Sequence, residues 1–217
     1  MAGLKAVIFD NDGTIADTHD MILASFIHAT EEVLGKALPE DVLMEKVGIP
    51  LADQMKDFSD DPEVQEKLLK SYRSYNHKIH DEMIAKFPGE DEALSELNSM
   101  GLKMAVVTSK RHWLAARGLE VLGIEKYFEF LIGADDCEGH KPGPEPVLAC
   151  VDKLGLSPAE CAYVGDSPFD IMAANAAGCM SIGVIWGMFN REKLKPERPD
   201  AICSNFQELV ETVRGAL

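Results

Sequence analysis

The chain has 217 residues, of which 46% are hydrophobic and 27% charged, and its formal net charge is −16. This composition excludes an intrinsically disordered protein, and the negative charge argues against nucleic acid as a partner because phosphate backbones repel an acidic surface. The sequence contains no run of about 18 apolar residues, so we expect no membrane span.

The first predicted element is a strand at residues 5–9, which follows Met1 so closely that no room is left for a signal peptide. We therefore expect a cytoplasmic protein. The cysteines fit this location, because they are odd in number, scattered and without a CxxC pair, which favours reduced thiols over a disulfide framework or a zinc site. They are Cys137, Cys150, Cys161, Cys179 and Cys203.

Short β-branched apolar runs alternate with amphipathic helical patterns over most of the chain. Alternation of this kind predicts an α/β fold with a doubly wound, Rossmann-like parallel sheet. The expected strands are residues 5–9, 103–108, 129–133, 161–165 and 179–185. The expected helices lie near residues 90–100, 111–122, 144–154 and 169–177.

One long segment interrupts the alternation. From about Thr18 to Lys86 the sequence shows only helical periodicity. Roughly seventy helical residues are too many for an ordinary crossover between two strands. We predict an inserted helical cap domain at residues 17–86, and a catalytic core made of residues 1–16 and 87–217.

Two carboxylates follow the first predicted strand, at the edge where open α/β sheets bind their ligands. Asp10 is suited to attack phosphorus as a nucleophile while a divalent cation offsets the charge repulsion. Asp12 is suited to protonate the leaving-group oxygen and then to activate water. Gly13 permits the sharp turn after the strand. A solvated turn is the alternative interpretation of these residues taken alone.

Two further stretches of the sequence contain groups that could bind a phosphoryl oxygen. Thr108 ends the second predicted strand, where its hydroxyl and the following backbone N–H groups can donate hydrogen bonds. Lys141 lies in a rigid loop and could neutralise both the nucleophile and the phosphoryl charge. Taken alone, Thr108 also fits a helix N-cap, and Lys141 also fits an exposed surface lysine.

A second acidic pair, Asp166 and Asp170, follows the strand at residues 161–165. Carboxylates at a strand end suit Mg²⁺, which prefers oxygen ligands. Asp166 is placed to bind the metal directly, and Asp170, one helical turn on, to bind it or to support a ligand. An acidic helix N-terminus is the alternative. The order of acid pair, hydroxyl, lysine and second acid pair, each near a strand end, indicates phosphoryl transfer.

These residues resemble the four motifs of the haloacid-dehalogenase-like hydrolase superfamily, over essentially the whole chain. The matching stretches are FDNDGT at 9–14, VVTS at 106–109, KPGPEP at 141–146 and GDSPFD at 165–170. Asn11 replaces the apolar residue that is common between the two acids of the first motif. The helical insert is similar to the small cap of one branch of the superfamily.

The resemblance implies a role for each motif residue. Asp10 would be the nucleophile and Asp12 the general acid and base. Thr108 and Lys141 would bind phosphate. Asp10, the backbone carbonyl of Asp12 and Asp166 would bind magnesium.

Two stretches of the insert resemble particular members of the superfamily. Members that form a Schiff base carry a lysine around position 51 and phosphosugar mutases tend to carry an arginine, whereas this chain has Leu51. The pattern at residues 48–51 is similar to phosphoglycolate phosphatases and related pyrophosphatases. Residues 72–81, and residues 108–111 of the core, are similar to bacterial pyrophosphatases of the superfamily.

Basic residues in the insert form one helix face. Arg73, His77 and His80 are spaced four and three residues apart, which places them on one side of a helix. This face would suit a second phosphate or a carboxylate on the leaving group, and Lys110 and Arg111, just beyond Thr108, are placed to meet that group. Ser109 is a further candidate substrate-binding residue. A solvated helix face is the alternative.

We therefore expect an enzyme that hydrolyses a small phosphorylated metabolite with Mg²⁺ as cofactor, with inorganic pyrophosphate slightly favoured over phosphoglycolate. A low-selectivity housekeeping phosphatase, a phosphosugar mutase and a non-catalytic binding module are the alternatives. The expected partner is a small-molecule substrate, with no nucleic acid and no membrane, and the expected assembly is a monomer or homodimer.

Overall fold

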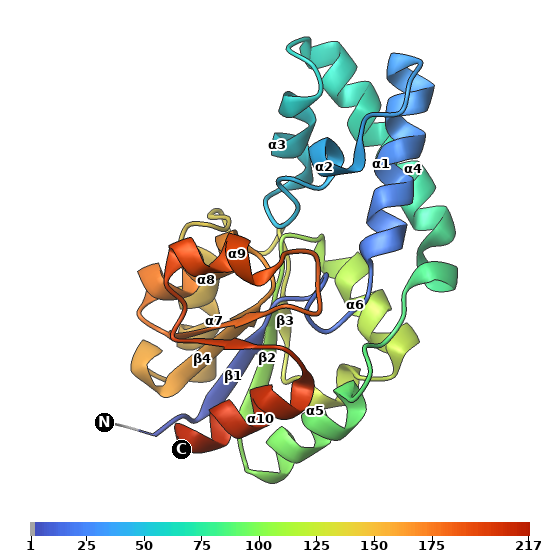
Figure 1. Ribbon diagram of the computed structural model, residues 1–217. Helices are drawn as coiled ribbons and strands as arrows, with labels where there is room; N and C mark the ends of the chain where they lie inside the picture. The colour runs from blue at the N-terminus through green and yellow to red at the C-terminus, as the bar shows by residue number, and fades with distance from the viewer. Residues whose placement is uncertain (1–2) are drawn as a thin grey trace.

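A six-stranded parallel sheet forms the centre of the computed structural model, which describes residues 3–217 (Figure 1). The strand order is β3-β2-β1-β4-β5-β6. The chain adds β2 and β3 on one side of β1 and β4 to β6 on the other, and this switch of side opens a crevice at the carboxyl ends of β1 and β4. This is the doubly wound α/β fold that the sequence predicts. The strands are β1 (Ala6–Phe9), β2 (Lys103–Val107), β3 (Leu131–Ile132), β4 (Cys161–Gly165), β5 (Met180–Val184) and β6 (Ala201–Cys203).

Strand register sets which residues leave the sheet together. Phe9 in β1 lies opposite Val106 in β2 and opposite Val164 in β4. The residues that follow these three positions therefore emerge side by side from the carboxyl edge of the sheet. The stretches at Asp10, Thr108 and Asp166 are the ones that do so.

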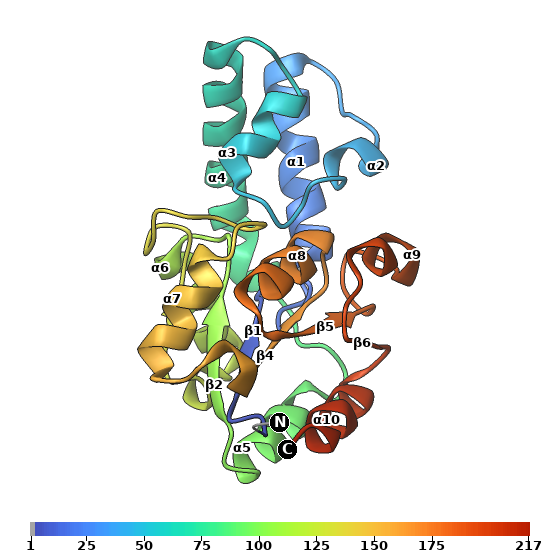
Figure 2. The same cartoon turned by 90° about the vertical axis from the view of Figure 1, so that its left-hand side faces the viewer.

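Helices cover both faces of the sheet (Figure 2). Because side chains alternate along a strand, Val7 and Phe9 enter one apolar cluster while Ala6 and Ile8 enter the other. The first cluster includes α5 (Glu90–Ser99), α6 (His112–Leu122) and α10 (Phe206–Gly215), and the second includes α7 (Glu145–Leu154) and α8 (Pro168–Ala177).

Residues 17–86, termed here the helical segment, stand above the carboxyl edge of the sheet (Figures 1 and 2). They have an apolar cluster of their own, which includes Phe26, Met55 and Leu68. The division into core and cap domains stays a prediction. The helices of this segment are α1 (His19–Leu34), α2 (Glu40–Leu43), α3 (Leu51–Gln54) and α4 (Pro62–Met83).

The two connections of the helical segment run next to each other. Asp17 and Ala85 exchange two backbone hydrogen bonds, with N–O distances of 2.8 and 3.1 Å. Both residues fall where the sequence predicts the ends of the insert. Any movement of the helical segment relative to the sheet must therefore involve these two paired connections.

The C-terminal part of the chain differs from the sequence analysis, which identified neither β6 nor α10. A three-residue strand shows no measurable period, which explains the first omission. The helix α10 does carry a signal, because Asn205 caps it and Phe206, Leu209, Val210 and Val213 are buried at helical spacing. Short helical turns complete the fold: α9 (Arg191–Leu194) and 3₁₀ turns at Met55–Asp57, Glu125–Tyr127, Pro158–Glu160 and Lys195–Glu197.

All five cysteines are free thiols, and four of them are buried, as the sequence predicts. Among the described residues, no helix combines the length and the apolar character that crossing a membrane would need.

Candidate active site

Four side chains from different strand ends and loops meet in one pocket at the carboxyl edge of the sheet. Asp10 follows β1, Thr108 follows β2, Asp166 follows β4, and Lys141 comes from the loop before α7. All four are at most 5% exposed and line a cavity of about 330 Å³. The structure therefore brings together the residues that the sequence singles out for chemistry.

Lys141 is the cation at the centre of this group. Its Nζ donates to Oδ1 of Asp10 at 2.8 Å and to Oδ1 of Asp170 at 2.6 Å. Burial lowers the pKa of Lys141, but the two carboxylates outweigh that effect and raise it well above its ordinary value. Lys141 is therefore a buried charged group, which excludes the alternative of an exposed surface lysine.

The carboxylates around Lys141 carry more negative charge than one lysine neutralises. Burial, and then repulsion from Asp170, raise the pKa of Asp10 to about 7, although Lys141 partly offsets both effects. Burial and the charges of Asp170 and Asp10 likewise raise the pKa of Asp166 well above its ordinary value. A second positive charge would relieve this repulsion.

The arrangement of the carboxylate oxygens fits a divalent cation. Asp10, Asp166 and Asp170 each place one oxygen within 4.8 Å of the others. The two oxygens of Asp170 are already bound by protein donors, Oδ1 by Lys141 and Oδ2 by the backbone N–H and hydroxyl of Ser167. Asp10 and Asp166 each keep one oxygen for which the described residues provide no donor. These two acids are thus the better placed ligands, with Asp170 in support.

Local sequence explains where Asp170 lies. Ser167 and Asp170 form a capping box at the start of α8, in which each side chain binds the backbone N–H of the other. Pro168 occupies the first helical position, where its missing N–H costs nothing. The same turn that begins the helix therefore directs the Asp170 carboxylate toward Lys141.

A backbone contact that the sequence analysis missed holds Asp166 in place, and two glycines leave room for it. The backbone N–H of Met188 donates to Oδ2 of Asp166 at 2.6 Å. A Cβ on Gly187 would collide with the Gly13 carbonyl and with Asp166, and one on Gly13, whose φ is +80°, would also collide with Asp166. Because β5 ends at the same edge of the sheet, its following loop was the place to search for such a contact.

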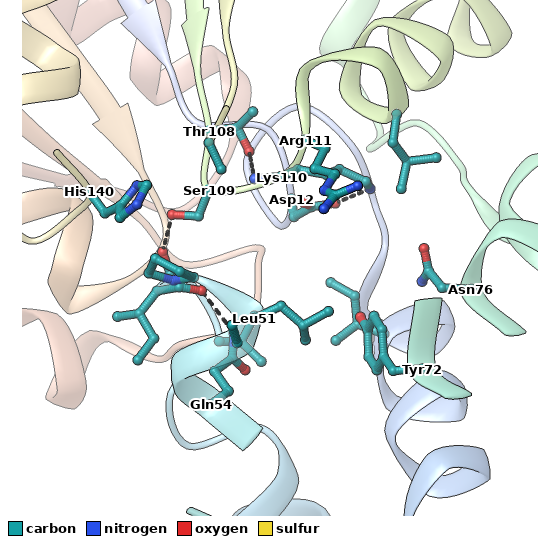
Figure 3. Close-up of a pocket in the computed structure, with 18 of the residues that line it drawn as sticks. Asp12, Leu51, Gln54, Tyr72, Asn76, Thr108, Ser109, Lys110, Arg111 and His140 are labelled. Carbon is teal, nitrogen blue, oxygen red and sulfur yellow. Dashed lines mark hydrogen bonds and ion pairs between the residues drawn. The ribbon is translucent and has the colours of Figure 1, made fainter. Parts of the chain in front are cut away.

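The loop after β2 connects the pocket to the helical segment. Lys110 Nζ donates to Oδ1 of Asp12 at 2.8 Å, and the Lys110 backbone N–H donates to the Thr108 hydroxyl oxygen at 3.1 Å. The Ser109 hydroxyl donates to the Gly48 carbonyl at 2.6 Å. Figure 3 shows that Ser109 thus points toward the loop of the helical segment. The Asp12 carboxylate is therefore paired with Lys110, and the Ser109 hydroxyl donates its hydrogen to a backbone carbonyl of the helical segment.

The predicted basic face of the insert divides into two parts. Arg73 and His77 on α4 line the pocket together with Lys110 and Arg111. His80, which was expected on the same face, is fully buried and lies outside the pocket lining, and a Cβ on Gly118 of α6 would lie 3.6 Å from its Nε2. The reason is that the lower part of α4 packs against α6.

A family model described as "Haloacid dehalogenase-like hydrolase" matches residues 7–184. The chain belongs to this family. It is 41% identical over 212 residues to a protein named "Putative pyrophosphatase PpaX" from Caldanaerobacter subterraneus subsp. tengcongensis, covering 98% of this chain and 96% of the relative. It is 32% identical over 210 residues to pyrophosphatase PpaX of Bacillus pumilus, covering 97% of this chain and 96% of that one.

A solved structure of this hydrolase type has the same fold. The crystal structure of a predicted phosphoglycolate phosphatase from Haemophilus somnus 129PT superposes with a TM-score of 0.89 at 25% identity, covering 98% of this chain and 99% of that chain. Family membership and these relatives show that the chain is a phosphatase of the haloacid dehalogenase-like hydrolases. The motif residues Asp10, Asp12, Thr108, Lys141 and Asp166 all lie within the part that matches the family model.

Proposed function

We propose that the protein is a Mg²⁺-dependent phosphohydrolase that transfers a phosphoryl group from a small metabolite to Asp10 and then to water. The observation that carries this proposal is the contact between Asp10 and Lys141 inside a buried pocket that also contains Asp166 and Thr108. A carboxylate can attack an anionic phosphoryl group only if nearby positive charge offsets the repulsion between them. Lys141 supplies one such charge next to Asp10.

Each residue has a defined part in the phosphoryl step. Asp10 attacks phosphorus with the carboxylate oxygen that Lys141 does not bind. Lys141 offsets charge on the nucleophile and on the phosphoryl oxygens. The Thr108 hydroxyl accepts a hydrogen bond from Lys110, so its own hydrogen is free to donate to a phosphoryl oxygen.

Asp12 serves the proton transfers. In its protonated form it gives a proton to the oxygen of the leaving group. After that group departs, the resulting carboxylate takes a proton from the water that attacks the aspartyl phosphate, which restores the acid. Its pairing with Lys110 fixes its carboxylate at the pocket wall. Asp10 and Asp166 would hold Mg²⁺, which would supply charge compensation and orientation for the phosphoryl group.

The helical segment forms the other wall of the pocket, through residues that include Phe26, Ile49 and Leu51. An apolar wall excludes water from the phosphoryl group before the acceptor water is needed. Leu51 offers neither the amine of a Schiff-base enzyme nor the guanidinium expected of a mutase. We infer that this wall closes over the substrate and opens for product release.

We favour inorganic pyrophosphate as the substrate, with phosphoglycolate as the second candidate. Relatives with 41% and 32% identity carry the name pyrophosphatase, and a structural neighbour carries the name phosphoglycolate phosphatase.

The free thiols agree with a reducing compartment such as the cytoplasm.

Phosphate release from pyrophosphate, phosphoglycolate and an aryl phosphate, each with and without Mg²⁺, tests this function. We expect Mg²⁺-dependent release, fastest from pyrophosphate. Release that is unaffected by removal of divalent cations would contradict the metal requirement. A failure to release phosphate from all three compounds, or isomerisation of a sugar phosphate instead, would overturn the proposed function.

A further inference from the structure

Two arginines from different parts of the chain line the pocket. Arg73 projects from α4 of the helical segment, and Arg111 immediately precedes α6, next to the loop that carries Thr108. Figure 3 shows Arg111 and Lys110 extending into the space that Tyr72 and Asn76 of α4 bound on the other side. A ligand in this space would contact both the helical segment and the loop that follows β2.

Neither arginine has an acidic partner in the part of the chain that the structure describes. Within residues 3–217, no carboxylate pairs with Arg73 or Arg111, whereas Arg117 pairs with Asp81 at 2.6 Å and Arg214 pairs with Glu96. Arg191 and Arg198 also form no ion pair among the described residues, but they do not line the pocket, so Arg73 and Arg111 are set apart by their position in it. A guanidinium group that lines a pocket and has no carboxylate partner can bind an external anion.

The positive charge of Arg111 also acts on Arg73. Burial, and then the charge of Arg111, lower the pKa of Arg73. Burial, and then repulsion from the charged forms of His80, Arg73 and Arg111, lower the pKa of His77. Two arginines that lie in a partly buried part of the pocket, neither paired with a carboxylate, cost free energy, which a bound anion would recover.

We propose that Arg73 and Arg111, with His77 beside them, form a distal anion site that binds the phosphate of a phosphorylated leaving group. This inference rests on the proposed function, which places the transferred phosphoryl group at Asp10. Two guanidinium groups carry a charge of +2, which a phosphate dianion balances and a single carboxylate does not. Each planar fork can also bind two phosphate oxygens at once. The site therefore favours pyrophosphate over phosphoglycolate.

The site has a consequence for the helical segment. Because Arg73 and Arg111 come from different parts of the chain, an anion between them connects the helical segment to the sheet. The charge of the leaving group would then help to hold the pocket closed during phosphoryl transfer. Substrates without this second charge would lose that assistance and would turn over more slowly.

The first test is the substrate dependence of the variants Arg73→Gln and Arg111→Gln. We expect each to lower kcat/KM for pyrophosphate by about tenfold or more and the double variant by about a hundredfold, because charge-assisted hydrogen bonds are lost. Hydrolysis of p-nitrophenyl phosphate, whose leaving group has no anion, should stay within about threefold of the unchanged protein. Lys78→Gln, an exposed charge removal on the same helix, is the matched control.

The second test measures binding without turnover. Trp113 packs edge-on against His77, with ring centroids 4.8 Å apart, so its fluorescence should report an anion bound beside His77. In Asp10→Asn protein, pyrophosphate should change this fluorescence, and Arg73→Gln should weaken the apparent affinity about tenfold. Trp113→Phe should remove the signal.

The outcomes separate this inference from the proposed function. Equal losses on pyrophosphate and on the aryl phosphate, or unchanged pyrophosphate hydrolysis in the double variant, would overturn the distal site while the phosphatase activity stands. No Mg²⁺-dependent hydrolysis of any substrate by the unchanged protein would overturn the proposed function instead. Circular dichroism of each variant identifies a loss caused by misfolding, and Arg73→Lys, which keeps the charge without the fork, should then give partial activity on pyrophosphate.

Discussion

The Nζ atom of Lys141 lies 2.8 Å from Oδ1 of Asp10, although 131 positions separate the two residues in the chain. The β1 strand delivers the carboxylate and the loop before α7 delivers the ammonium. Both groups are almost fully buried, and the same lysine also binds Asp170 at 2.6 Å. One cation thus holds together acids from two separate motifs.

Removal of that cation should destabilise the protein. In Lys141→Met, the carboxylates of Asp10 and Asp170 would be buried without a cationic partner, and breaking a buried pair costs about 3–5 kcal/mol. Urea unfolding at neutral pH should show this decrease in the free energy of unfolding. Lys5→Met, which breaks an exposed pair with Glu160, should change little. Equal unfolding curves for the two variants would refute the central role of Lys141.

Replacement of Asp12 should separate the two chemical steps. In Asp12→Asn, an aryl phosphate with a good leaving group can still phosphorylate Asp10, but no carboxylate activates water for the second step. Phosphorylated protein should therefore accumulate, and mass spectrometry after acid quenching should find one phosphoryl group on the peptide that contains Asp10. Rapid steady-state turnover without phosphoprotein in this variant would contradict the role of Asp12.

The Gly48 loop should be sensitive to a single methyl group. Gly48 has φ +114°, and a Cβ there would lie 2.9 Å from Ser167 Oγ and 3.2 Å from Phe169. Gly48→Ala should push the loop away from the pocket and lower kcat by about tenfold. Gly35→Ala is the control, because Gly35 has φ +73° but open space around it, so it adds strain without the collision. Equal activity in the two variants would show that the loop contact is irrelevant.

Stability should depend on pH through Glu90, a buried residue at the start of α5. Its Oε2 accepts the Phe87 N–H, and burial is the main cause that raises its pKa to about 7. A raised folded-state pKa means that the group's contribution is complete below about pH 4.5 and is lost as pH rises through about 7. Glu90→Gln should therefore be more stable than the unchanged protein at pH 8, by up to about 3 kcal/mol, and no less stable at pH 5.

Urea unfolding at the two pH values measures this difference. Glu92→Gln, an exposed change on the same helix, should show no such dependence. A Glu90→Gln variant that is less stable than the unchanged protein at pH 8 would mean that the folded state requires the ionised carboxylate.

The sequence predicts the core of the site well because its residues follow strands directly. Once β1, β2 and β4 are placed in a parallel sheet, Asp10, Thr108 and Asp166 must lie at one edge. Periodicity and strand order are local properties that a single sequence carries. The roles of these residues in catalysis stay predictions until the measurements above are made.

Contacts that depend on tertiary packing could not be predicted in the same way. His80 has the helical spacing of a pocket residue, yet α6 buries it, because helix spacing does not show which neighbour a face meets. The Met188 N–H that binds Asp166 comes from a loop with no motif of its own. The hydrogen bond from Ser109 to Gly48 depends on how the helical segment rests on the sheet.

The most direct test of the account is phosphate release by the unchanged protein and by Asp10→Asn, assayed with pyrophosphate in the presence of Mg²⁺. The account predicts rapid release by the unchanged protein and none by the variant, with identical circular dichroism spectra for the two. Sustained release by a folded Asp10→Asn protein would show that Asp10 is not the nucleophile, and the mechanism proposed here would be wrong.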